Sequence, residues 1–194
     1  MKIFFDTEFT GLHKNTTLIS IGLIDEEGRS FYAEFNDYDL SQCDDWIKEN
    51  VIAHLKYHGT HTNMQLWGHD PKENLTYAIG DTEFIQEKIE QWLLSYDKVQ
   101  LVSDVCHYDM VLFIDIFGGA FDIPNNVNPA CHDINQDIAM YYMLTESEAF
   151  DKSREDILKD FNVTIDGDKH NSLYDAKVIK EIYKAIEPEI GIIS

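Results

Sequence analysis

Hydrophobic and polar residues alternate along the first part of the chain at the period of β-strands. An apolar run at residues 3–5 opens the sequence, residues 16–24 (TTLISIGLI) are rich in β-branched side chains, and residues 30–35 (SFYAEF) alternate in polarity. The acidic segment 25–28, which ends in Gly, has the composition of a turn. These patterns predict three antiparallel strands that form a meander.

From residue 81 onwards helical spacing takes over, interrupted by short strands. The helix at 81–93 is amphipathic, with Phe84, Ile89 and Trp92 on one side. Further helices are predicted at 108–117, 136–144, 153–161 and 172–186, with strands at 99–103 and 130–134 and an exposed acidic segment at 145–151. The order predicts an α/β fold with a mixed sheet of about five strands flanked by helices.

The segment between Asn36 and Gly80 is the least regular part of the sequence. Residues 40–57 have helical spacing with Ser41 as a candidate cap, and the remainder predicts a long surface connection. Within it, histidines 54, 58 and 61 have the i, i+4, i+7 spacing of transition-metal ligands. Because no Cys or acid accompanies them in a recognised pattern, we expect them to be surface residues.

Composition limits the class of protein. A chain of 194 residues suits a single domain over 1–194, and its formal charge of −21 is far from the basic balance of proteins that grip nucleic acid through its phosphates. Either the partner is not nucleic acid, or metal ions supply the local positive charge. Three dispersed cysteines and no run of 18 apolar residues favour a soluble, cytoplasmic protein that does not enter a membrane.

Two carboxylates follow the first apolar run. Asp6 and Glu8 are two residues apart, so in a strand they point to the same face. Like charges placed side by side repel unless a cation lies between them, and all-oxygen ligands suit Mg²⁺ or Mn²⁺. The alternative is a strand that simply ends in solvent with acidic residues.

A second acid is expected at the carboxyl end of the strand at 99–103, where ligands gather in open α/β sheets. Asp109 begins the following helix, and Asp104 directly after the strand competes for the same role. If this strand runs parallel to the first, Asp109 faces Asp6 and Glu8. Taken alone, Asp109 is also explained as an acid favoured by the helix dipole.

A third candidate lies at the start of the last helix. Asp175 is placed about one turn into that helix, and His170 precedes it by five residues on the connecting loop. This pattern offers a fixed carboxylate for a metal and an imidazole able to take a proton. Each residue could equally be a helix N-terminal acid or a surface histidine.

The segments FDTEFTGL, YDMVLF and HNSLYDAK together resemble the three exonuclease motifs of the DEDDh family, in order and over nearly the whole chain. YDMVLFIDIFGGAFDIP is similar to the mycobacterial-type 3′–5′ exoribonuclease subfamily, which favours Asp109 over Asp104. The His-x4-Asp spacing separates the chain from the branch with Tyr-x3-Asp. Many relatives have His-Asn where Ser103-Asp104 stands here, so the substrate contacts of those residues are in question.

The resemblance implies an RNase H-like fold and hydrolysis that releases 5′-mononucleotides from 3′ ends. Two Mg²⁺ or Mn²⁺ ions would be held by Asp6, Glu8, Asp109 and Asp175, and His170 would be the general base. Thr7, Phe9, Gly11 and Leu12 would lie beside the terminal nucleotide.

The expected substrate is single-stranded RNA or a 3′ overhang. A DNA exonuclease and a catalytically silent binding module on the same fold are the alternatives. The resemblance also favours a homodimer, for which residues 36–80 and the tail after Pro188 are candidate contact surfaces.

Overall fold

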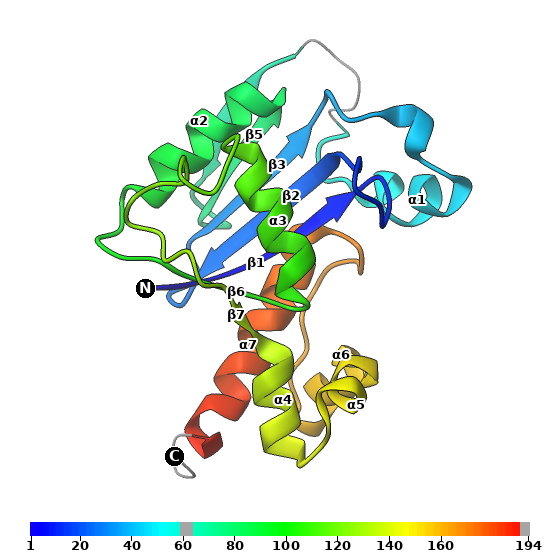
Figure 1. Ribbon diagram of the computed structural model, residues 1–194, viewed down its shortest axis with the longest axis vertical. Coiled ribbons are helices and arrows are strands. Elements are labelled where there is room, and N and C mark those ends of the chain that lie inside the picture. The colour runs from blue at the N-terminus through cyan, green and yellow to red at the C-terminus, as the bar shows by residue number, and fades with distance from the viewer. Residues whose placement is uncertain (59–63, 191–194) are drawn as a thin grey trace.

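The computed structural model describes residues 1–58 and 64–190, and they build a seven-stranded mixed sheet in the order β4-β5-β3-β2-β1-β6-β7 (Figure 1). The strands are β1 (Lys2–Phe9), β2 (Leu18–Asp25), β3 (Ser30–Phe35), β4 (Leu66–Asp70), β5 (Leu75–Gly80), β6 (Gln100–Ser103) and β7 (His132–Asp133). The antiparallel meander β1-β2-β3 is confirmed. β6 lies parallel to β1, with Phe4 opposite Val102, as the site prediction required.

The sheet has more strands than expected, because β4 and β5 come from the segment predicted to be a surface connection. That prediction was wrong, because neither strand has the alternation of apolar and polar residues that marks a half-buried strand. β5 is buried on both faces and pairs parallel to β3, so it lacks polar alternation. β4 is a mostly exposed edge strand paired only with β5, so it lacks an apolar face. The predicted contact role of residues 59–63 and of His61 lies outside the described residues.

The helices are α1 (Asp45–Asn50), α2 (Thr82–Leu93), α3 (Cys106–Ile116), α4 (Ile134–Tyr142), α5 (Glu146–Asp151), α6 (Arg154–Asp160) and α7 (Ser172–Ile190), with 3₁₀ turns η1 (Leu40–Gln42) and η2 (Ile52–His54). The predicted helix at 40–57 is thus three short pieces, and Asp44 rather than Ser41 caps α1. The acidic segment predicted only as exposed contains α5, which a Thr145–Glu148 capping box begins. No helix of the described residues is both long and apolar enough to cross a membrane.

Helices cover both faces of the sheet, and this sorts the side chains of β1. Figure 1 shows α2 and α3 over one face and α7 over the other. Phe5 packs with Phe113 of α3, whereas Phe4 packs with Tyr183 of α7. Since successive strand residues alternate in direction, the face of Phe4 is also that of Asp6 and Glu8. The strand therefore carries these two carboxylates towards α7.

The start of α7 lies unusually close to β2. A Cβ atom on Gly22 would lie 2.4 Å from the Leu173 Cα, so only glycine permits this approach. Beside it, the Ser20 and Ser172 hydroxyls are hydrogen-bonded at 2.9 Å. These contacts fix the first turn of α7, and with it Asp175, against the sheet.

Candidate active site

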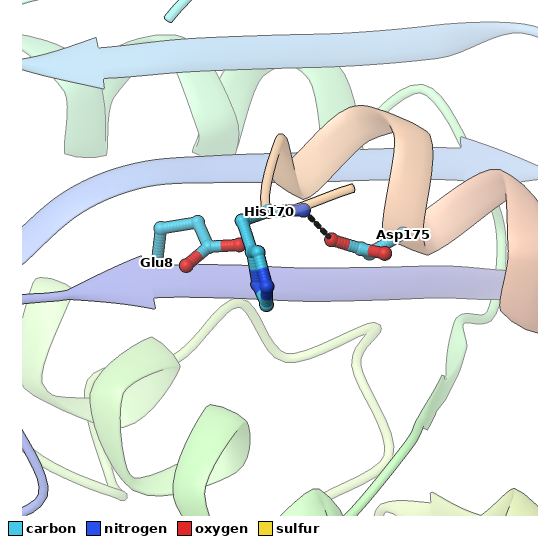
Figure 2. A group of neighbouring side chains, drawn as sticks. All are labelled: Glu8, His170 and Asp175. Carbon is cyan, nitrogen blue, oxygen red and sulfur yellow. Dashed lines mark hydrogen bonds between the residues drawn. The ribbon is translucent and has the colours of Figure 1, made fainter. Parts of the chain in front are cut away.

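The carboxyl end of β1 and the first turn of α7 meet to form the centre of the site. Glu8, His170 and Asp175 each offer one ligand atom within 4.8 Å of the others. Figure 2 shows the Glu8 and Asp175 carboxyl groups with His170 between them. It is the one such group of three His, Cys, Asp or Glu residues within 1–58 and 64–190. Two motifs about 160 residues apart are thus brought together, as the resemblance to the DEDDh family implies.

The loop before α7 holds His170 by its backbone. The His170 N–H donates to Asp175 Oδ2 at 2.9 Å, so the two site residues fix each other (Figure 2). His170 has φ +64°, a left-handed conformation that costs a non-glycine residue free energy. Its ring meets Trp46 of α1 edge to face, at 5.1 Å between ring centroids. Sequence patterns gave no reason to place Trp46 here, because α1 belongs to the irregular segment.

Asp109 reaches the site from the opposite face of β1. It lies in the first turn of α3 and is 4% exposed. Its Oδ1 accepts from the Thr7 N–H at 3.1 Å and from the Thr7 hydroxyl at 2.5 Å, and the Ser103 hydroxyl donates to Oδ2. Thr7, which we expected beside the nucleotide, therefore donates both its N–H and its hydroxyl to Asp109. The sequence analysis did not predict Ser103 as a residue of the site. Its position at the end of the strand that precedes the helix of Asp109 is the sequence signal that could have identified it.

Asp104, the competitor of Asp109, is engaged elsewhere. Arg154 of α6 donates from Nε and from Nη2 to its two carboxyl oxygens, at 2.6 and 2.8 Å. Asn135 donates to Asp104 Oδ1 at 2.8 Å and accepts from Arg154 Nη2 at 2.6 Å. A cation already compensates the charge of Asp104, whereas no Lys or Arg of the described residues forms an ion pair with the carboxyl group of Asp109. The geometry therefore favours Asp109 as the second acid.

The site carboxylates lie close to one another in a poorly solvated place, and their pKa values respond accordingly. Burial and the neighbouring acids raise the pKa of Asp6 and of Glu8 well above the ordinary range. Burial raises the pKa of Asp109 and of Asp175 to about 7, against the hydrogen bonds they accept. Burial, with Lys169 and His54 nearby, lowers the pKa of His170. Such acids are not all ionised together without added positive charge.

A cavity of about 480 Å³ opens over these carboxylates. Its floor includes Asp6, Glu8 and Asp175, and its far wall is the corner between α5 and α6. That wall was not anticipated from the sequence. Its lining side chains include Phe150, Asp151, Lys152, Ser153, Arg154 and Glu155.

A second, more apolar groove of about 430 Å³ begins at Phe9, the last residue of β1, and follows the loop after the strand. It contains three of the residues predicted to meet the nucleotide, Phe9, Gly11 and Leu12, of which Leu12 is 74% exposed. The first turns of α3 provide the opposite wall with His107, Tyr108 and Val111. The Phe9 and Tyr108 rings lie 6.5 Å apart between centroids.

The histidine pattern at 54, 58 and 61 does not gain a metal site from the described residues. His54 Nδ1 is hydrogen-bonded to the Lys169 backbone carbonyl at 3.0 Å, which supports the loop that carries His170. His61 lies outside the described residues.

The chain is similar to known nucleases over most of its length. The family model described as the 3′-5′ exoribonuclease Rv2179c-like domain matches residues 1–187. The 3′-5′ exoribonuclease Rv2179c of Mycobacterium tuberculosis is 26% identical over 136 residues, covering 70% of this chain and 73% of that protein.

Solved structures share the fold at lower identity. The nuclease domain of 3′hExo, a DEDDh family member bound to rAMP, matches with TM-score 0.61, 16% identity, and coverage of 98% of this chain and 92% of that one. S. pombe Pop2p in its Mg²⁺- and Mn²⁺-bound form matches with TM-score 0.60, 17% identity, and coverage of 94% and 81%. The predicted fold class is confirmed.

Proposed function

Because this chain belongs to the Rv2179c-like 3′-5′ exoribonuclease domain family, we propose that it removes nucleoside 5′-monophosphates one at a time from the 3′ end of RNA. The observation that carries the proposal is the meeting of four acids and a histidine at one edge of the sheet. Asp6 and Glu8 come from β1, Asp109 from α3, and His170 and Asp175 from the start of α7.

The donor set fits a pair of hard divalent cations. Asp109 is buried and the other three carboxylates are half-buried, and burial raises the pKa of each, so the ionised forms need a compensating charge. Asp6, Glu8, Asp109 and Asp175 would hold two Mg²⁺ or Mn²⁺ ions. When bound, these ions supply Lewis-acid charge that stabilises the phosphate during an in-line displacement.

His170 takes a proton from the attacking water. Its lowered pKa leaves the imidazole neutral near pH 7 and therefore able to accept that proton. The water oxygen forms a bond to phosphorus, and the bond from phosphorus to the 3′ oxygen of the preceding nucleotide breaks. That oxygen leaves with the shortened chain and takes a proton from solvent. The Asp175 carboxylate and the Trp46 ring keep His170 beside the acids meanwhile.

The apolar groove beyond the end of β1 receives the terminal nucleotide. Phe9, Leu12 and Tyr108 present faces on which a base can stack, and stacking tolerates every base because each has a π-face. Gly11 has φ +154°, and this lets the chain turn back after β1 to form the groove. A single-stranded 3′ end or overhang suits this groove, because its base is free to enter.

The test is release of monophosphate from 3′-labelled RNA and from DNA of the same sequence, with Mg²⁺ or Mn²⁺. We expect RNA to be hydrolysed, and Asp6→Asn and His170→Ala each to lower kcat by a hundredfold or more while the protein stays folded. The matched controls are Asp97→Asn, an exposed acid near the other end of β1, and His69→Ala on the edge strand β4.

The alternatives give different outcomes in the same assay. A preference for DNA would indicate a DNA exonuclease. Full activity of a folded Asp6→Asn variant would refute the assignment of the site. A silent binding module would show neither hydrolysis nor a rise of melting temperature on addition of Mn²⁺.

A further inference from the structure

The cationic side chains around the catalytic cavity are already neutralised by the protein itself. Lys152 lies 3.9 Å from Asp160, Arg154 lies 2.6 Å from Asp104, and Lys169 lies 3.1 Å from Glu155. The cavity is also lined by six carboxylates, which belong to Asp6, Glu8, Asp104, Asp151, Glu155 and Asp175. Each of the three cations therefore already has a carboxylate partner, with which the phosphate of an RNA chain would have to compete.

The lining of the apolar groove carries one lysine, Lys14, and one carboxylate, Asp115. Lys14 is exposed, and no carboxylate in the part of the chain that the structure describes lies within ion-pair distance of its ammonium group. Glu8 belongs to the cavity and Phe9 to the groove, so the two hollows adjoin at the end of β1. Lys14 is thus the cation placed for a phosphate next to the one that is cleaved.

Beyond these two hollows a longer RNA meets a chain of net charge −21. Proteins that bind long nucleic acid use a stripe of unpaired Lys and Arg along the backbone path. The other lysines without a carboxylate partner in the described residues, at 72, 98, 177 and 180, line neither hollow. Additional phosphates therefore add repulsion, which salt screens, and no attraction.

Resting on the proposed function, we propose that the enzyme grips only the last two nucleotides of its substrate, with Lys14 as its one phosphate contact outside the catalytic centre. Its substrates are then short oligoribonucleotides as readily as long RNA, and it releases the chain after each cleavage. Affinity comes from the stacked terminal base and the scissile phosphate, both of which a trinucleotide already supplies.

Salt dependence makes the proposal quantitative. Binding to single strands falls with salt at a slope of about −0.7 per phosphate contact, so one contact predicts about a fivefold loss of kcat/KM for a tenfold rise in salt. An enzyme with six contacts would lose about 10⁴-fold over the same range.

The experiment measures initial-rate kcat/KM on oligoadenylates of 3, 6 and 20 nucleotides at 50 and 500 mM NaCl and fixed, saturating Mg²⁺. We expect values that rise no more than tenfold from the shortest to the longest RNA, and that fall no more than tenfold with salt. Lys14→Gln should lower kcat/KM about fivefold at 50 mM and abolish most of the salt dependence. Lys98→Gln, which removes an exposed lysine near the other end of β1, should change neither.

The proposal would be overturned if kcat/KM rose more than tenfold with RNA length or fell more than tenfold with salt. It would also be overturned if Lys14→Gln left the salt dependence of kcat/KM unchanged. Equilibrium binding of fluorescent 3- and 20-nucleotide RNAs to His170→Ala, which keeps all four carboxylates, gives a readout independent of hydrolysis. Equal affinities there, with no turnover by the unaltered enzyme, would refute the proposed function and leave the two-nucleotide grip standing. Turnover by the unaltered enzyme together with much tighter binding of the longer RNA would support the proposed function and refute the two-nucleotide grip.

Discussion

Replacing Asp175 by Asn should stabilise the metal-free protein while removing its response to metal. Burial, the largest cause, raises the pKa of Asp175 from 3.8 to about 7. Asn has nearly the same shape as the protonated carboxyl group and keeps an oxygen to accept the His170 N–H. The substitution therefore removes a charge that the fold tolerates poorly and keeps its principal hydrogen bond.

The size of the effect follows from the shift in pKa. A folded pKa raised above the unfolded value means that the ionised form is penalised by folding, so the penalty appears as pH rises through 3.8 and is complete above about 7. At about 1.4 kcal/mol per pH unit the full penalty is roughly 4 kcal/mol. Relaxation and entry of water reduce it, and we expect Asp175→Asn to add about 2 kcal/mol to the free energy of unfolding at pH 8.

Urea unfolding in EDTA at pH 8 and at pH 4 measures this directly. The gain should be present at pH 8 and absent at pH 4, where the carboxyl group is protonated in the folded protein. Adding Mg²⁺ at 100 times its Kd should stabilise the unaltered protein by about 2.7 kcal/mol and the variant much less. A metal-free variant that is less stable than the parent at pH 8, or a gain that does not depend on pH, would refute this account, and Asp97→Asn should show neither effect.

Three further changes test other parts of the structure. Gly22→Ala should lower kcat more than tenfold and cost about 1–3 kcal/mol of stability, because its methyl group displaces the start of α7; normal activity would show that the close approach is dispensable. Arg154→Met should cost about 3–5 kcal/mol in urea unfolding by leaving Asp104 without its cation, and adding Asp104→Asn should recover much of this loss, whereas no recovery would mean that the pair is not the cause. The hydrogen bond to Asp137 raises the pKa of His132, so His132→Gln should destabilise the protein below pH 6.5 and progressively less as pH rises past the folded pKa; a loss that grows with pH would contradict this.

The parts of the site that lie along single elements could be predicted from the sequence. Asp6 and Glu8 follow a buried strand two residues apart, and the pleat alone places them on one face. Asp175 lies in the first turn of α7, as its distance from the loop histidine indicated. In each case a local period decided the direction of a side chain, and the structure agrees.

The parts that depend on contacts between distant elements could not be predicted. Asp109 approaches from the face opposite to Asp6, and it is held there by the Thr7 N–H and by the hydroxyls of Thr7 and Ser103. Gly22 carries no signal until the backbone of α7 is placed against it. Strand β4 escaped because an exposed edge strand has no apolar face for a pattern to reveal.

The Ser103-Asp104 pair has a structural rationale in this chain. Ser103 donates to Asp109 and so fixes an acid at the end of β6. Asp104 binds Arg154, whose remaining donors reach the backbone carbonyls of Ala149 and Lys152 at 2.9 and 2.7 Å. One end of β6 thereby holds both an acid of the site and the α5–α6 wall of the cavity.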